Sequence, residues 1–203
     1  MLVAEKIVLK SLGRVAYEPT LQAMREFNAK RGAQTPDELW LLEHPPVYTL
    51  GLGAEAAPAG DNGIPLVRTE RGGEITYHGP GQLVVYTLVD LARRGLKVKR
   101  FVWLLEQAVI DLLGARAERR AGAPGVYVGG AKIAALGIRV ARGCAYHGLA
   151  LNVDMDLAPF AAIDPCGMPG LRVTQTTDLG LDYSVAGAGE RLAQLLCERL
   201  EHA

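Results

Sequence analysis

Two adjacent glycines, Gly129 and Gly130, constrain the fold of this 203-residue chain more than any other feature. They separate two β-prone runs, 125–128 and 131–140. A Gly-Gly pair between such runs is typical of a two-residue β-hairpin turn, because glycine adopts the positive φ angles that this turn requires. The sequence therefore predicts an antiparallel hairpin over 125–140.

Lys132 is the one charged residue near the start of the second run. In a regular strand it shares a face with Ala134, Leu136 and Ile138. If that face is buried, the charged ammonium is costly to hold and its pKa should fall, which would make Lys132 a proton acceptor near neutral pH. The alternative is a solvated lysine beside a tight turn, where it protects an edge strand from pairing.

Composition narrows the class of protein. Lys+Arg and Asp+Glu both number 22, so the net charge is zero, which argues against a nucleic-acid-binding protein. Three cysteines are too few for a disulfide framework, and no apolar stretch is long enough to span a membrane. Because a charge at Glu5 precedes any signal-like apolar run, we expect a cytoplasmic protein.

Hydrophobic periodicity predicts a mixture of strands and helices without regular βαβ alternation. The predicted strands are 5–13, 39–43, 47–50, 64–68, 82–90, 125–128, 131–140 and 144–154, and the predicted helices are 16–31, 99–114 and 187–201. This pattern favours an α+β fold, in which a mixed or largely antiparallel sheet is flanked by helices. No linker demands a second domain, so we expect residues 1–203 to form one.

Two further segments have compositions that packing alone does not require. Residues 71–82 contain four glycines and a proline, which fits either a ligand-binding loop or a complicated turn, and His78 could orient a ligand or cap that turn. Cys166 lies between prolines and glycines in 165–170. Its sulfur is either presented to solvent, where it could react as a thiolate, or it is an inert side chain in a turn.

Cys144 and His147 are spaced three residues apart in a predicted strand, which places them on opposite faces. The sequence offers no convincing second pair of ligands, so we expect no metal site and interpret both residues as packing residues.

Three blocks carry a family resemblance: RGGEITYHGPGQL at 71–83, GAKIAALG at 130–137 and PCGMPG at 165–170. Together and in this order they resemble the signature blocks of the lipoyl(octanoyl) transferases, over roughly residues 35–180. That family implies the fold of the biotin and lipoate protein ligase catalytic domains. It also implies a catalytic pair, carried here by Cys166 and Lys132. The chain departs from the common pattern at Thr87, where proline is usual, and at 174–176.

The resemblance also implies residues that line the substrate. These are Arg71, Gly72, Gly73, Glu74, Ile75, Thr76, Tyr77, His78, Ala135, Leu136, Gly137, Gly148, Leu149 and Ala150.

The activity implied is transfer of an octanoyl group from octanoyl-acyl carrier protein to a lysine of a lipoate-dependent protein. The acceptors would be the lipoyl domains of 2-oxoacid dehydrogenases and the glycine cleavage H protein. We hypothesise that Lys132 takes the proton of Cys166, whose thiolate then attacks the octanoyl thioester. Backbone N–H groups near Gly79 and Gly167 are the expected donors to the oxyanion. The reaction would need no cofactor, and the protein is expected to be a monomer.

A basic cluster lies between the strand at 82–90 and the following helix, at Arg93, Arg94, Lys97, Lys99 and Arg100. Because the carrier is acidic, we expect this cluster to steer it, although a solvated loop is an equal alternative.

Two other functions compete with acyl transfer. An ATP-dependent lipoate or biotin ligase of the same fold would use the lysine for an acyl-adenylate and need no catalytic cysteine. A non-catalytic acyl-binding module would bind octanoate without a covalent adduct.

Overall fold

A computed structural model of the chain describes residues 7–54, 58, 63–164 and 170–203. Their main element is a seven-stranded sheet with the order β1-β2-β6-β10-β9-β8-β7. β1 and β2 are parallel, and the other neighbours are antiparallel, so the sheet is mixed as predicted. Its strands are β1 (Val8–Arg14), β2 (Glu38–Glu43), β6 (Gln82–Asp90), β7 (Ala117–Glu118), β8 (Gly125–Val128), β9 (Ala131–Ala141) and β10 (Cys144–Asn152).

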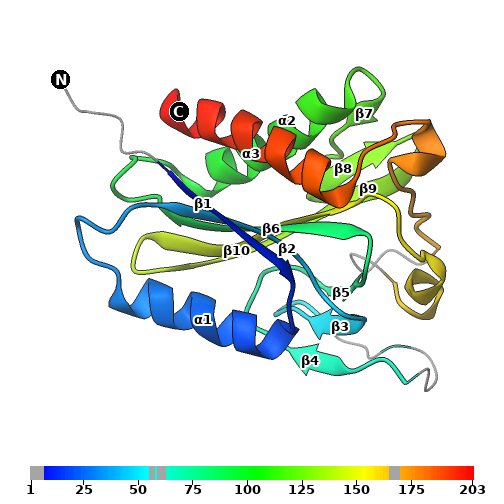
Figure 1. The fold of residues 1–203 in the computed structure, drawn as a ribbon, viewed down its shortest axis with the longest axis horizontal. Coiled ribbons are helices and arrows are strands. Elements are labelled where there is room, and N and C mark those ends of the chain that lie inside the picture. Colours follow the sequence, from blue (N-terminus) through cyan, green and yellow to red (C-terminus); the bar gives the residue numbers. More distant parts are fainter. Residues whose placement is uncertain (1–6, 55–57, 59–62, 165–169) are drawn as a thin grey trace.

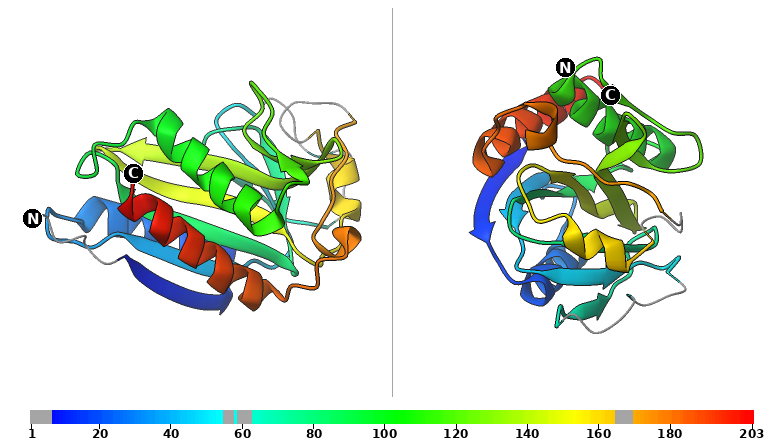
Figure 2. Two further views of the ribbon diagram at one scale, coloured as in Figure 1. Left: turned by 90° about the horizontal axis from the view of Figure 1, so that it is seen from above. Right: turned by 90° about the vertical axis from the view of Figure 1, so that its right-hand side faces the viewer.

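Helices cover both faces of this sheet (Figures 1 and 2). α2 (Val98–Leu113) and α3 (Val185–Glu201) pack side by side on one face, over a core that includes Leu83, Leu149 and Ile133. α1 (Tyr17–Lys30) covers part of the other face, where Trp40, Val84 and Tyr86 form a second core. Each predicted helix is confirmed to within two residues at either end.

A three-stranded sheet of order β4-β3-β5 lies beside α1 (Figure 1). It is formed by β3 (Val47–Leu50), β4 (Leu66–Arg68) and β5 (Ile75–His78). The 3₁₀ helix η1 (Ala158–Ala162) packs on it through Phe160, whose ring meets that of Tyr77 edge to face at 5.5 Å. A further 3₁₀ turn, η3 (Thr177–Leu179), precedes α3. β5 was not predicted, because the glycines on both sides of this short strand favour a loop.

The hairpin prediction is confirmed. Val128 pairs with Ala131 across Gly129 and Gly130, whose φ angles are 54° and 85°. These positive values are the backbone geometry for which the glycines are needed.

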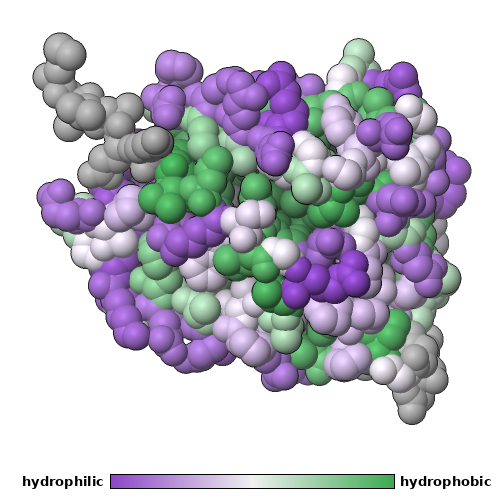
Figure 3. Space-filling view, in the orientation of Figure 1, coloured by the Kyte–Doolittle hydropathy of each residue, from purple (hydrophilic) through white to green (hydrophobic). Residues whose placement is uncertain are grey.

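The edge strand β1 exposes several apolar side chains. Val8, Leu9 and Leu12 are each more than a third exposed, and Figure 3 shows hydrophobic surface over β1 among mostly hydrophilic side chains. Among the described residues, no helix is both long and apolar enough to cross a membrane.

Candidate functional site

A cavity lies between the α1-side face of the large sheet and the segment 71–78. Its volume is about 70 Å³, counted as the space open to the centre of a water molecule. Its floor follows β6, β9 and β10, and its walls come from α1, β5 and η1.

Most of the residues that the family resemblance implied line this one cavity. They are Arg71, Gly73, Glu74, Ile75, Thr76, His78, Lys132, Ala135, Leu136, Gly137, Gly148, Leu149 and Ala150. Gly72 and Tyr77 do not line it: the N–H of Gly72 donates to Ile138 O at 2.9 Å, and Tyr77 packs between Tyr48 and Phe160. Cys166 and Gly167 lie outside the described residues.

Lys132 is only 4% exposed, so the predicted burial is confirmed. Its Nζ donates to Pro124 O at 3.0 Å and lies 5.5 Å from the centre of the Tyr127 ring. A Cβ on Gly125 would stand 2.5 Å from Lys132 Cε, so the glycine leaves room for the lysine side chain. The alternative of a solvated turn lysine is therefore wrong.

The predicted face of Lys132 is also wrong. The pairing register between β8 and β9 shifts so that Val126 faces Ala134 while Tyr127 faces Lys132, which leaves Ile133 as an extra residue. A β-bulge of this kind reverses the alternation of side chains. Lys132 therefore lies opposite the face of Ala134, Leu136 and Ile138, and it lines the cavity with Ala135 and Gly137.

The chain enters and leaves the 165–169 segment beside this cavity. Before the segment, Phe160 lines the cavity and Ile163 packs in the same cluster as Phe160. After it, Val173 lines the cavity and forms a bridge with Lys132. The backbone N–H of Lys132 donates to Arg172 O at 2.8 Å. Arg172 is six positions from Cys166 (172 − 166).

Arg71 is buried, and its guanidinium is held by the backbone and side chain of Thr49. Arg71 Nη2 donates to Thr49 O at 2.7 Å and to Thr49 Oγ1 at 2.8 Å, and Nη1 donates to Gly72 O. A Cβ on Gly137 would approach Gly72 O to 2.8 Å. Gly137 is thus required for the close packing of segment 71–72 on the floor of the cavity.

Histidines and tyrosines form a buried polar network at the cavity. His44 Nδ1 donates to Val15 O, so its Nε2 accepts from the Tyr86 hydroxyl, each at 2.7 Å. His78 Nδ1 donates to Gln82 Oε1 at 2.7 Å, and Gln82 in turn donates to Asn152 Oδ1. Burial lowers the pKa of His44 to about 4 and that of His78 to about 3, so both are neutral at pH 7.

Sequence reasoning missed several residues that line the cavity: Tyr17, Gln82, Val84, Tyr86, Ile133, Ala134, His147, Asn152, Phe160 and Val173. Gln82 was available as a signal because it lies within the first signature block. Tyr17 carried no signal, since it belongs to an ordinary amphipathic helix pattern.

His147 is buried, as expected of a packing residue, but it also lies at the cavity, so the interpretation of it as a packing residue stays a prediction. His147 has φ 62°, unusual for a residue inside a strand, and it lines the cavity. Cys144, in contrast, is buried away from the cavity and its Sγ lies 3.7 Å from Arg142 O, which fits packing. Within the described part of the chain, no three His, Cys, Asp or Glu residues are placed to hold a metal ion.

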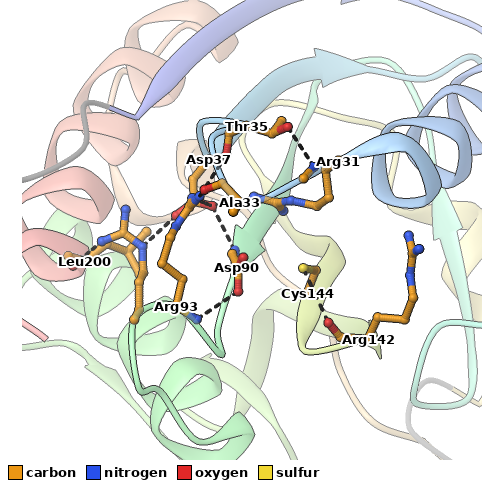
Figure 4. Close-up of polar contacts among 11 residues, drawn as sticks. Arg31, Ala33, Thr35, Asp37, Asp90, Arg93, Arg142, Cys144 and Leu200 are labelled. Atoms are coloured by element: carbon orange, nitrogen blue, oxygen red, sulfur yellow. Dashed lines mark hydrogen bonds and ion pairs between the residues drawn. The ribbon is translucent and has the colours of Figure 1, made fainter.

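The structure gives two members of the basic cluster at 93–100 an internal role, while carrier steering by the cluster stays a prediction. Arg93 and Arg94 form ion pairs of 2.9 and 2.6 Å with Asp37, which is 1% exposed (Figure 4). Arg94 further donates to Leu200 O at 2.8 Å. These two arginines hold the strand ends and α3 together, leaving Lys97, Lys99 and Arg100 as the exposed members.

That cluster is also far from Lys132. It follows Asp90, which pairs with Cys144, and Cys144 pairs with Ala141. Ala141 is nine residues along β9 from Lys132 (141 − 132), which corresponds to roughly 30 Å of strand.

Comparison with known proteins agrees with this architecture. Residues 16–196 match the family model of the lipoyl protein ligase A/B catalytic domain, and the chain belongs to that family. Among curated relatives, proteins named octanoyltransferase are highly similar. The one from Dechloromonas aromatica is 59% identical over 96% of this chain and 97% of its own. The one from Thiobacillus denitrificans is 62% identical over 97% of this chain and 90% of its own.

Solved structures share the fold at low sequence identity. A bipartite lipoate protein ligase from Thermoplasma acidophilum superposes with a TM-score of 0.76 at 19% identity, covering 96% of this chain and 84% of that one. A biotin protein ligase from Aquifex aeolicus gives 0.55 at 13% identity, covering 98% and 70%. The α+β fold predicted from the family resemblance is thus confirmed.

Proposed function

We propose that this protein is an octanoyltransferase, which moves an octanoyl group from an acyl carrier protein to a lysine of a lipoyl domain. The observation that carries the proposal is the burial of Lys132 in the wall of the cavity that most of the expected substrate-lining residues share. The name of the relatives at 59–62% identity supports the same activity. We further propose that residues 1–203 work as one catalytic domain.

In the proposed mechanism Cys166 is the nucleophile and Lys132 the general base. Lys132 accepts the Cys166 thiol proton, and the thiolate attacks the octanoyl thioester carbon. As the tetrahedral intermediate collapses, Lys132 protonates the departing pantetheine thiol and the octanoyl group remains on Cys166. The bridge between Lys132 and Val173 supports this pairing, because it anchors the chain shortly after Cys166 to the strand that carries the base.

The second half of the reaction transfers the acyl group to the acceptor. A neutral lysine amine of the lipoyl domain attacks the thioester, Lys132 takes the excess proton, and the Cys166 thiol is regenerated. Both steps proceed without ATP, since the donor is already a thioester. Gly79 does not line the cavity, and Gly167 lies outside the described residues. The backbone N–H groups near these glycines therefore stay a prediction as donors to the oxyanion.

The acyl-enzyme is tested by intact-protein mass after mixing with octanoyl-carrier protein. We expect one octanoyl adduct on the wild type and none on Cys166→Ala. Lys132→Met keeps the apolar stem of the side chain but removes the base, and it should form the adduct about a hundredfold or more slowly. An adduct on Cys166→Ala, or an unchanged rate in Lys132→Met, would contradict the assigned roles.

The rival function is ATP-dependent ligation, and it is favoured by one observation: this fold is shared with a lipoate-protein ligase A that was solved with ATP bound. A ligase would catalyse octanoate-dependent exchange between ATP and pyrophosphate. No adduct on the wild type together with exchange would assign the ligase function. No adduct and no exchange would leave a passive acyl-binding protein.

A further inference from the structure

We infer that the His147 side chain blocks the inner end of the cavity and thereby limits the length of the acyl chain that the protein accepts. This inference rests on the proposed acyl transfer, and it adds a specificity-determining residue to it. Three independent features of the structure point to His147: its place along the cavity, its backbone conformation and its polar neighbours.

His147 lies at a position along the floor of the cavity where its side chain can limit how far an acyl chain extends. His147 pairs with Ile138, and Leu151 pairs with Ala134, the residue that follows the bulge beside Lys132. Ala134 and Ile138 are four residues apart (138 − 134), which is about 13 Å of strand. An extended octanoyl chain is about 9 Å long, so its tail approaches His147 once its thioester lies near Lys132.

The floor between these two points carries small side chains. Ala135 pairs with Ala150, and Gly137 pairs with Gly148, and all four residues line the cavity. Beside and beyond Gly148 the lining residues become large: Tyr86, which pairs with Gly148, together with His147 and Tyr17. A hollow lined by alanine and glycine therefore ends at a group of rings.

The backbone at His147 is held in a conformation that turns its ring toward this end. The neighbours Ala145 and Leu149 pack in the core beneath α2 and α3, so strict alternation would send the side chain of His147 there as well. Instead, with φ 62°, the imidazole stacks on Tyr146 at 5.1 Å and meets Tyr86 edge to face at 6.1 Å. The Thr87 hydroxyl donates to His147 O at 3.0 Å and fixes this conformation.

Strained backbone of this kind persists where the surroundings over-determine it, and it is concentrated at functional sites. The strain at His147 has a direct structural result, because it removes the imidazole from the helix-side core and places it against the acyl cavity.

Polar atoms gather near this end of the cavity. Tyr17 Oη and His147 Nε2, both on residues that line the cavity, are buried without a hydrogen-bond partner. His147 Nε2 is 3.8 Å from Glu70 Oε1, too long for a hydrogen bond.

The test is an acyl-length series with octanoyl, decanoyl and dodecanoyl thioesters of pantetheine as small donors and a lipoyl domain as acceptor. The readout is the ratio of kcat/KM for decanoyl over octanoyl. His147→Gly and His147→Ala should raise this ratio about fifteenfold, since each newly buried methylene contributes about fourfold. Two variants are used because glycine also loosens the backbone, whereas alanine does not.

His44→Ala is the matched control. It removes an equally buried imidazole that also packs against Tyr86, at 5.8 Å, but His44 does not line the cavity. Its decanoyl-to-octanoyl ratio should stay at the wild-type value. A shift in the control as large as that in the His147 variants would assign the effect to loosened packing and overturn the inference.

The two possible failures are distinguishable. If the wild type transfers none of the acyl groups, the proposed function fails. If it transfers octanoyl, and folded His147→Gly and His147→Ala keep the wild-type ratio, the proposed function stands and the inference about His147 is overturned. Far-UV circular dichroism and thermal unfolding establish that the variants are folded.

Discussion

His44 and His78 are neutral in the folded protein because burial lowers their pKa to about 4 and about 3, from 6.5. In the unfolded chain both take up a proton as the pH falls below about 6.5. The unfolded state therefore binds more protons between pH 6.5 and 4, so stability is highest above this window and decreases as the pH falls through it. The pKa of His147 is lowered in the same direction by burial, against the opposing effect of Glu70.

We expect the free energy of unfolding to fall by about 2 to 3 kcal/mol between pH 6 and pH 5 from His44 and His78 together, since each contributes at most about 1.4 kcal/mol per pH unit. Urea denaturation at several pH values measures this. His44→Gln and His78→Gln should each remove about half of the part of the slope that these two histidines contribute. The lowered pKa values of Asp37 and Glu70 act below pH 4.5 and leave this window unaffected. A wild-type slope near zero would refute the assignment of buried neutral histidines.

The histidines also show what single residues reveal in a sequence. Lys132 was recognised because a lone charge in a small apolar run is conspicuous. His147 was not, because alternation in a strand predicts which face a side chain takes and gives no sign of a positive φ in a residue other than glycine. Only the structure, with Thr87 bonded to its carbonyl oxygen, places its ring.

At the scale of elements, the β8–β9 hairpin positions Lys132 through its turn and its bulge. The turn was predictable from Gly129 and Gly130, whose local chemistry selects the backbone geometry. The bulge was not, because it depends on how β9 pairs with β8 on one side and with residues 172–174 on the other. Consequently the sequence predicted the hairpin and the burial of Lys132, yet gave the wrong face of the sheet.

Gly125 tests how much the placement of Lys132 matters. In Gly125→Ala the new Cβ would meet Lys132 Cε at 2.5 Å and Ala134 O at 2.8 Å, so the lysine has to move. We expect kcat for octanoyl transfer to fall roughly tenfold to a hundredfold, as displacement of a catalytic group by about 1 Å does. Single-turnover transfer to a lipoyl domain measures the effect.

Gly122→Ala is the control for Gly125→Ala. Gly122 also has a positive φ, 77°, but a Cβ there has open space around it. Both variants lose stability, by about 1 to 3 kcal/mol, because of backbone strain. Only Gly125→Ala should lose activity, and equal rates in the two folded variants would show that Lys132 tolerates displacement.

At the scale of the molecule, the two ends of the large sheet have different roles. At the end that carries Asp90, Asp37 gathers Arg31, Arg93 and Arg94 into a buried ion-pair network (Figure 4). The other end carries Lys132, from which the cavity extends along the sheet toward His147. The pattern of charged residues in the sequence could not separate these roles. A cluster of arginines has the same pattern whether it binds a partner or pairs with a distant carboxylate such as Asp37.

Another pair of arginines lies at the cavity end. Arg120 stacks on Tyr127 at 4.6 Å, over the same ring that Lys132 approaches, and Arg172 Nη2 donates to Gly129 O at 3.0 Å. Both guanidinium groups flank Gly130, two residues from Lys132. If an acidic carrier protein delivers the octanoyl thioester, these arginines are better placed to receive it than the cluster at 93–100.

We expect the double charge reversal Arg120→Glu with Arg172→Glu to raise KM for octanoyl-carrier protein by about tenfold or more at low salt. KM for octanoyl-pantetheine should stay unchanged, because charge complementarity acts on the encounter with a charged partner. The difference should shrink as salt screens it. Lys97→Glu with Lys99→Glu alters the net charge equally at the far end of the sheet and should change neither KM. If instead only Lys97→Glu with Lys99→Glu raised KM for octanoyl-carrier protein, the docking site would be the cluster at 93–100. If the Arg120 and Arg172 variant raised KM equally for both donors, these arginines would support the cavity itself.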